Sequence, residues 1–304
     1  MHFSGFEGET KEEMFQQLPL ELLPLSIMIN PSENFDCIVK KIYAAGLQFP
    51  LAVKPDVGTK GLLFRRIENE EQLKFYHSLL PFTYVIEQFV TLPLELSIFY
   101  VRYPGKKKGM ITGLIAKEYL HVVGDGKSTL KQLIEKHPKA FMIGNEQKHK
   151  HAEKLNNIIA ANEIFYLNEL GNHNRGARFI NLHHKIDEQL LNVVDEINLY
   201  SKHFYYGRYD IKTNSLEDLK HCRNTLILEF NGVGSEPNHI YDIGLNYKQA
   251  FSIIAKHWKY MYEIGKINYK NGIDYIPFWK GWQMFGQSKK HTKLMKQLDL
   301  QSKL

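Results

Sequence analysis

The sequence has little cysteine, no long apolar run and no repeated or low-complexity segment. Cys37 and Cys222 are its only cysteines, which provides no disulfide framework and fits a reducing cytoplasm. No apolar run approaches the ~20 residues of a membrane-spanning helix, and residues 1–17 lack the basic and apolar regions of a signal peptide. We therefore expect a cytoplasmic globular protein with no membrane span.

Several catalytic motifs are also missing. The segment GDGKST at 124–129 is similar to a phosphate-binding P-loop, but that motif needs a glycine where this chain has His121. We interpret the segment as a tight turn followed by a helix that Ser128 or Thr129 caps. His149 and His151 lie two residues apart with no ligands nearby in the sequence, so we expect solvated histidines. No Ser-His-Asp or Cys-His arrangement stands out.

A net charge of +6 and a pI near 9.0 are the clearest compositional features. They suit a nucleotide, nucleic acid or an anionic membrane surface equally well. The lysines are scattered and the aromatics form no stacking motif, so we expect no nucleic-acid partner. Residues 289–304 hold five lysines against one aspartate, which indicates a solvated helix end. We interpret Trp258, Tyr260 and Tyr262 as packing aromatics.

Two polar strands near the middle of the chain carry the strongest functional signal. Alternation along residues 204–212 places Arg208 and Asp210 on one face, and alternation along 225–231 does the same for Glu229 and Asn231. Carboxylate and amide oxygens are ligands that Mg²⁺ prefers. From these residues alone, a site for a cation and an anion and an ordinary solvated hairpin are equally good interpretations.

Other candidate phosphate-binding residues are spread along the chain. A short predicted strand at 49–55 ends near Lys54 and leads into a glycine-bracketed turn at 58–61, which includes Thr59 and Lys60. Such a turn can present backbone N–H groups to an anion, although a plain hairpin loop is the simpler interpretation. Lys117 lies within an apolar segment, where a lysine needs an anion or a carboxylate nearby. Arg175 and Arg178 form a basic loop that is equally well a solvated turn.

Taken in order, VKPDVGTKG, VIEQFV with the downstream Glu95, Lys117, GRYDIK and LEFNGVGS resemble the ATP-grasp superfamily. Within it, they are similar to the D-alanine:D-alanine ligase-like carboxylate–amine ligases. The resemblance covers roughly residues 10–250. It implies an α+β fold of two α/β subdomains, whose mainly antiparallel sheets grip a nucleotide between them. It also implies four regions: a reduced N-terminal segment at 1–50, a small subdomain at 51–125 with a hinge at 87–95, a large subdomain at 126–255 and a helical tail at 256–304.

The resemblance assigns roles to individual residues. The catalytic residues would be Arg208, which steadies the transferred phosphate, and Lys54, which holds the α- and β-phosphates of the nucleotide. The metal ligands for Mg²⁺ or Mn²⁺ would be Asp210, Glu229 and Asn231. Nucleotide contacts would come from Lys11, Lys54, Gly58, Thr59, Lys60, Gly61, Glu87, Gln88, Phe89, Val90, Glu95 and Lys117. Substrate contacts would come from Arg175, Arg178, Gly234, Ser235 and Glu236.

The implied activity is ATP-dependent, ADP-forming ligation, in which a carboxylate becomes an acylphosphate and then joins an amine or a similar nucleophile. Such a protein would take small-molecule acids and amines as substrates. Two departures bear on the substrate: barely fifty residues precede Lys54, and NGVGSEPNHIYD replaces the serine-rich segment of dipeptide ligases. The alternative is a non-catalytic ATP-binding or regulatory module that shares the phosphate motifs.

Overall fold

The computed structural model describes residues 2–6, 8–59, 61–142, 144–168, 171–201, 203–242 and 244–302. The chain divides into two compact units, one formed by 1–115 together with 181–304 and the other by 116–180. Both contain helices and antiparallel strand pairs, which confirms the predicted α+β class. The sequence predicts four consecutive regions, whereas these two units are defined by contacts within the fold. The four regions stay a prediction.

The first unit contains a four-stranded sheet near the amino terminus, in the order β1-β4-β2-β3. Its strands are β1 (Ser26–Ile29), β2 (Leu51–Pro55), β3 (Arg65–Ile67) and β4 (Tyr84–Gln88), and every neighbouring pair is antiparallel. Two helices pack on it, α2 (Phe35–Ala44) and α3 (Glu70–Leu79), each capped by an asparagine side chain. Gly46 follows α2 with a φ of 73°, as the sequence predicts for a helix stop.

A five-stranded sheet, in the order β11-β10-β5-β6-β9, follows the first. Its strands are β5 (Leu94–Val101), β6 (Met110–Glu118), β9 (Arg178–Asn181), β10 (Tyr206–Thr213) and β11 (Thr225–Asn231). Side chains on β5 and β10 alternate between two faces. On one face, Tyr100 and Tyr209 bond to Asp195 and Asn198 of α7 (Glu188–Tyr200). The other face therefore holds the polar residues of β10.

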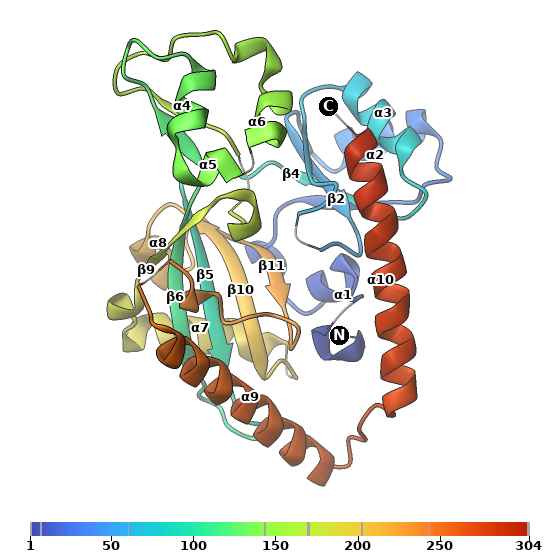
Figure 1. Ribbon diagram of the computed structural model, residues 1–304. Coiled ribbons are helices and arrows are strands. Elements are labelled where there is room, and N and C mark those ends of the chain that lie inside the picture. Colours follow the sequence, from blue (N-terminus) through green and yellow to red (C-terminus); the bar gives the residue numbers. More distant parts are fainter. Residues whose placement is uncertain are drawn as a thin grey trace. The chain divides into compact units, whose positions relative to one another are not determined.

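Two long helices end the chain (Figure 1). The first, α9 (Tyr247–Lys270), packs Tyr260 and Ile264 onto Phe99 and its neighbours in the five-stranded sheet. The second, α10 (Phe278–Gln301), places Met295 in the core of the four-stranded sheet. The described part of the chain contains no helix that is both long and apolar enough to cross a membrane.

The second unit, residues 116–180, has a small core of its own. Its strands β7 (His121–Val123) and β8 (Ile164–Tyr166) pair antiparallel. In the GDGKST segment, the Asp125 carboxylate accepts the backbone N–H groups of Lys127 and Ser128, and Thr129 caps the following helix in a capping box. The turn-and-cap interpretation of this segment is confirmed. The helices here are α4 (Leu130–Lys136), α5 (Pro138–Met142) and α6 (Gly144–Lys150).

Short elements complete the fold. Two short α-helices belong to the first unit, α1 (Lys11–Phe15) and α8 (Leu216–Lys220). The 3-10 turns are η1 (His2–Gly5), η2 (Leu20–Leu22), η3 (Ala152–Lys154), η4 (His173–Arg175), η5 (His183–Lys185) and η6 (Asn238–Ile240).

Candidate functional site

The predicted catalytic and metal residues of β10 and β11 lie together. The strands pair so that Arg208 is opposite Asn231 and Asp210 is opposite Glu229. Arg208 Nη2 donates a hydrogen bond to Asp210 Oδ2 at 3.1 Å, as expected for two residues on one face of a strand. On the next strand, Ser97 is the register partner of Asp210. The pairing of β10 with β11 thus places one guanidinium, two carboxylates and one amide at neighbouring positions of the two strands.

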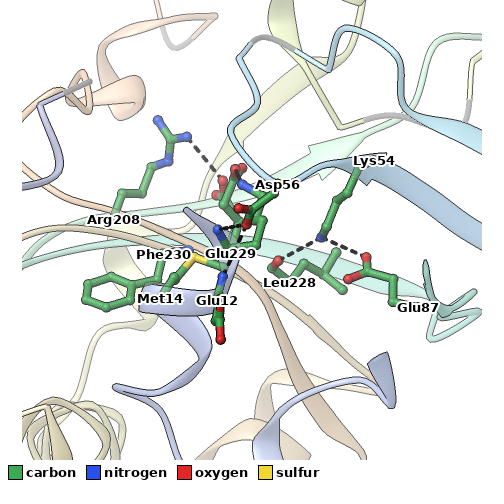
Figure 2. A network of polar contacts seen from close by, with 11 residues as sticks. Glu12, Met14, Lys54, Asp56, Glu87, Arg208, Leu228, Glu229 and Phe230 are labelled. Atoms are coloured by element: carbon green, nitrogen blue, oxygen red, sulfur yellow. Dashed lines mark hydrogen bonds and ion pairs between the residues drawn. The ribbon is translucent and has the colours of Figure 1, made fainter. Parts of the chain in front are cut away.

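An irregularity in β11 connects this group to the first sheet. The register shifts between Asp210 and Ile211, and Leu228 is skipped in the pairing. Such a bulge turns the local backbone, and the Leu228 carbonyl oxygen accepts a hydrogen bond from Lys54 Nζ at 3.3 Å (Figure 2). Lys54 Nζ also lies 2.7 Å from Glu87 Oε1, and this ion pair is nearly buried, with side-chain exposures of 13% and 4%. The predicted hinge acid and phosphate lysine therefore lie beside β11.

Lys11 brings a second ammonium group to the same place. Thr10 caps α1 by accepting the Glu13 N–H, and Lys11 Nζ lies 2.6 Å from Glu229 Oε1. The start of the helix is held by Asp56, whose Oδ1 accepts the Lys11 N–H at 2.7 Å. Sequence reasoning missed Asp56, although its place directly after Lys54-Pro55 was a usable signal. The helix position thus decides where the Lys11 charge lies.

Burial and neighbouring charges act against each other in this group. Burial raises the pKa of Glu229, but the charges of Lys11, Lys54 and Arg208 outweigh it, so the net pKa is lowered. Burial lowers the pKa of Lys11, and the Glu229 carboxylate reverses that, so the net pKa is raised. The pKa of Arg208 is raised for the same reason, with Asp210 as the main partner. All three groups are therefore charged at neutral pH.

The donor set fits a hard divalent cation. Asp210, Glu229 and Asn231 offer two carboxylates and one amide oxygen, and Mg²⁺ commonly takes one or two carboxylates and completes its shell with water and phosphate. No group of three or more His, Cys, Asp or Glu side chains suited to a metal occurs in the described ranges. A metal here would therefore depend on a ligand such as phosphate. Arg208 Nε and Asn231 Nδ2 are buried and have no hydrogen-bond partner among the described residues, so this group holds two unused donors.

The predicted hinge lies at the end of β4. Glu87 is buried and Gln88 is exposed. The Arg66 guanidinium lies 4.7 Å from the centre of the Phe89 ring. Lys212 Nζ donates to the Val90 carbonyl at 2.8 Å, and in the β5–β10 register Lys212 is the partner of Glu95. Sequence reasoning missed Lys212, although it lies two residues beyond Asp210 and alternation places it on the same face.

The predicted phosphate loop joins β2 to β3. The Leu62 N–H bonds to the Thr59 carbonyl at 3.0 Å, and Gly61 has a φ of 70°, so the segment is a tight turn in which glycine is favoured. Gly58 lies directly before this turn. The predicted ligand Lys60 lies outside the described residues.

The segment after Asn231 is paired with the amino terminus. Val233 N–H bonds to the Ser4 carbonyl at 3.1 Å and Gly234 N–H to the Gly5 carbonyl at 3.0 Å. A Cβ atom on Gly234 would lie 2.1 Å from the Phe6 carbonyl oxygen, so this approach of two backbones requires glycine. Sequence reasoning missed the contact, which the two closely spaced glycines of NGVG could have signalled. We refer to residues 4–6 as the amino-terminal arm.

The remaining candidate substrate residues lie in different places. Ser235 Oγ donates to the Gly232 carbonyl at 2.6 Å, and Glu236 Oε2 accepts from Tyr241 Oη at 2.7 Å. Both therefore stabilise the loop that follows β11. Lys117, Arg175 and Arg178 belong to the second unit, where Arg178 Nη1 lies 3.9 Å from Glu118 Oε2. Their predicted roles toward a nucleotide or a substrate stay predictions.

No protein-family model matches the sequence, and no curated protein matches it. Solved structures do match. A D-Ala:D-Ser ligase from Enterococcus faecalis is 14% identical with a TM-score of 0.46, over 81% of this chain and 61% of that one. A D-alanine–D-alanine ligase from Bacillus anthracis, complexed with ATP, is 15% identical with a TM-score of 0.41, over 77% and 60%.

A bifunctional glutathione synthetase from Pasteurella multocida is 15% identical with a TM-score of 0.42, over 82% of this chain and 35% of that one. The chain thus spans between about a third and about three fifths of the length of these structures. The predicted resemblance to ligases of this kind is confirmed as a resemblance. The case for an activity rests on the residues of the site.

Proposed function

We propose that this protein is an ATP- and Mg²⁺-dependent, ADP-forming ligase that activates a carboxylate as an acylphosphate and joins it to an amine. The observation that carries the proposal is the convergence of Lys11, Lys54 and Arg208 on the carboxylates of β4, β10 and β11. Lys11 pairs with Glu229 at 2.6 Å, Lys54 with Glu87 at 2.7 Å and Arg208 with Asp210 at 3.1 Å. A solvated hairpin needs no such arrangement, because charges are costly to hold out of water.

The chain's own charges suit phosphoryl transfer from ATP. In this reaction a carboxylate oxygen forms a bond to the γ-phosphorus while the bond to the β-phosphate oxygen breaks, which releases ADP. An amine then attacks the acyl carbon, inorganic phosphate leaves and the amine loses a proton. Negative charge is spread over phosphate oxygens throughout, and positioned cations stabilise it. We assign this role to Arg208 and Lys54, with Lys11 holding a nucleotide phosphate.

A divalent cation, when bound, would neutralise negative charge on the phosphates during transfer. Asp210, Glu229 and Asn231 would hold it. In this structure the first two side chains pair with Arg208 and Lys11, so these two cations hold the carboxylates in position. We expect Lys11 and Arg208 to turn toward phosphate when the nucleotide and the metal enter together.

The nucleotide base and ribose would lie at the end of β4. Glu87 to Val90 would receive adenine, partly through main-chain groups, and Glu95 would bind the ribose. Lys212 holds the Val90 carbonyl at 2.8 Å, which fixes the hinge next to the catalytic strand. The loop of Gly234, Ser235 and Glu236 would receive the acceptor substrate.

Release of ADP is the direct test. The protein would be incubated with ATP and Mg²⁺ or Mn²⁺ across a panel of amino acids and hydroxy acids, alone and in pairs with amines. We expect one acid to stimulate ADP formation and an acid–amine pair to stimulate it further. Binding of ATP with no stimulation by any acid would favour a regulatory ATP-binding module instead.

A further inference from the structure

The two carboxy-terminal helices expose an unusual set of aromatic side chains. Along α9, Tyr247, Phe251, Trp258, Tyr262 and Tyr269 follow one another at spacings of 4, 7, 4 and 7 residues, which places them on one face of the helix. All five are more than half exposed, from 53% for Tyr269 to 96% for Tyr247. We call these five residues the aromatic stripe. Because α9 packs on the sheet through Tyr260 and Ile264, the stripe belongs to a different face of the helix.

The aromatic side chains continue into α10. Every residue from 271 to 280 is exposed, including Ile273, Tyr275 and Ile276. In the first turns of α10, Phe278, Trp279 and Trp282 are 69%, 78% and 63% exposed. The three tryptophans of the chain are Trp258, Trp279 and Trp282, so all of them lie in these two helices and all are exposed. Large exposed apolar patches on a protein mark an interaction surface.

The charge of this segment is also distinct. Residues 247–304 hold eleven lysines, no arginine and three acidic residues, a net charge of +8, whereas the whole chain carries +6. Four lysines of α9 fall on the same side of the aromatic stripe when the helix is viewed along its axis. They are Lys248, Lys259, Lys266 and Lys270, and they line one edge of the stripe. Six of the eleven lysines lie in α9 and the start of α10, where the tryptophans are exposed; these are Lys248, Lys256, Lys259, Lys266, Lys270 and Lys280.

We propose that α9 and the start of α10 form a docking surface for an anionic lipid bilayer. Tryptophan and tyrosine rings with an apolar body and a polar tip prefer the interface between headgroups and acyl chains, and neighbouring lysines are attracted to anionic lipids. Aliphatic side chains such as Ile273 and Ile276 also enter acyl chains favourably. The protein would lie on the membrane surface through these two helices.

Two other occupants fit less well. A second copy of this chain would place two lysine-rich surfaces against each other, and like charges at an interface oppose association. A nucleic acid would be served better by arginine, which recognises phosphate in a bidentate manner, yet all eleven basic residues here are lysines. An anionic bilayer fits both the lysines and the exposed apolar rings.

Vesicle binding tests the proposal on the full chain. Phosphatidylcholine vesicles with and without phosphatidylglycerol would be mixed with the protein, and binding would be followed by sedimentation and by tryptophan emission. We expect binding only with phosphatidylglycerol, with emission moving to shorter wavelength because all three tryptophans enter the interface, and with loss of binding in high salt. Absence of binding to either vesicle would overturn the proposal.

Matched variants distinguish binding through this surface from nonspecific binding to vesicles. Lys248→Gln, Lys266→Gln and Lys270→Gln combined should weaken binding about one hundredfold, whereas Lys40→Gln, Lys127→Gln and Lys131→Gln combined remove the same charge elsewhere and should leave it unchanged. Trp279→Ser with Trp282→Ser should weaken binding, and Phe75→Ser with Tyr200→Ser should not. Equal losses in both sets would overturn the proposal. So would vesicle-independent dimerisation abolished by the tryptophan variants, or binding to single-stranded nucleic acid without binding to vesicles.

Discussion

Lys11 Nζ lies 2.6 Å from Glu229 Oε1, although 218 residues separate them in the chain. This ion pair joins the amino-terminal helix α1 to the last strand of the second sheet, and it makes Glu229 the centre of the proposed site. The Lys11 side chain is 11% exposed and that of Glu229 is 37% exposed. The carboxylate is thus held by the protein and still open to solvent on one side.

Glu229→Gln should abolish ligation and leave the fold intact. The amide keeps the shape of the side chain but lacks the charge that would hold a divalent cation and Lys11. We expect ADP release to fall at least about 100-fold, while the circular dichroism spectrum stays unchanged. Glu217→Gln is the control, since that side chain lies on helix α8 and is 65% exposed. Wild-type turnover in Glu229→Gln would show that the metal assignment is wrong.

Lys54 and Glu87 should behave as one unit in stability measurements. Each single change, Lys54→Met or Glu87→Gln, leaves a nearly buried charge without its partner and should lower the free energy of unfolding by ~3 kcal/mol. The double variant removes both charges, so its loss should be smaller than the sum of the two. Urea unfolding measures all four proteins. Additive losses would mean that the 2.7 Å contact contributes no coupling.

Arg208→Lys should separate nucleotide binding from transfer. Lysine keeps the positive charge but lacks the planar donor fork that reaches Asp210 Oδ2 and a phosphate together. We expect ATP affinity to change little and the rate of ADP formation to fall by about 100-fold. Isothermal titration and the ADP assay give the two quantities. A loss of ATP affinity with an unchanged maximal rate would assign Arg208 to nucleotide binding instead.

Stability should fall in mild acid because of two buried histidines. Burial lowers the pKa of His239 and of His257 to about 4, and nearby positive groups add to the effect. Between pH 6.5 and 4 the unfolded chain binds protons that the folded chain does not, so the free energy of unfolding decreases as the pH falls through that window. The decrease should be on the order of 3 kcal/mol for each of the two histidines.

A variant with both His239→Gln and His257→Gln isolates this contribution. Urea unfolding from pH 4.5 to 7.5 should show a flatter pH dependence than the wild type. Because His257 Nδ1 also contacts Tyr206 Oη at 3.2 Å, the variant should be less stable at pH 7.5 as well. Identical slopes in the two proteins would contradict the assignment.

Gly234→Ala should release the amino-terminal arm. The new methyl group would lie 2.1 Å from the Phe6 carbonyl oxygen, which belongs to the backbone and has to move. We expect faster amide exchange at residues 233 and 234, whose N–H groups donate to the Ser4 and Gly5 carbonyls, and quicker proteolysis near residues 4–6. Gly286→Ala is the control, because no atom lies within 4 Å of the added Cβ. Equal exchange at residues 233 and 234 in both variants would show that their pairing with the arm is weak.

Local sequence rules located much of the site because its parts obey simple periodicity. Alternation along β10 placed Arg208 and Asp210 on one face. The bulge at Leu228 could not be predicted from the sequence, because a register shift depends on how the two paired strands pack in the folded protein. The hydrogen bond from Lys54 Nζ to the Leu228 carbonyl follows from that shift.

Periodicity also fails to say which face of a helix is buried. We interpreted Trp258, Tyr260 and Tyr262 alike as packing residues, yet only Tyr260 is buried and the other two are 60% and 68% exposed. All three lie on an amphipathic helix with two apolar faces, and only the sheet beneath decides between them. The interpretation was therefore wrong for Trp258 and Tyr262, which belong to the proposed lipid surface.

The pairing of Ser4 and Gly5 with Val233 and Gly234 also sets an order of events during synthesis. At ~5–20 residues per second, a ribosome that has made Gly5 needs roughly ten to fifty seconds more to reach Gly234. Until then the Ser4 and Gly5 carbonyls lack the N–H groups with which they pair in the folded protein. The acceptor side of the proposed site is thus completed by segments that the ribosome makes far apart in time.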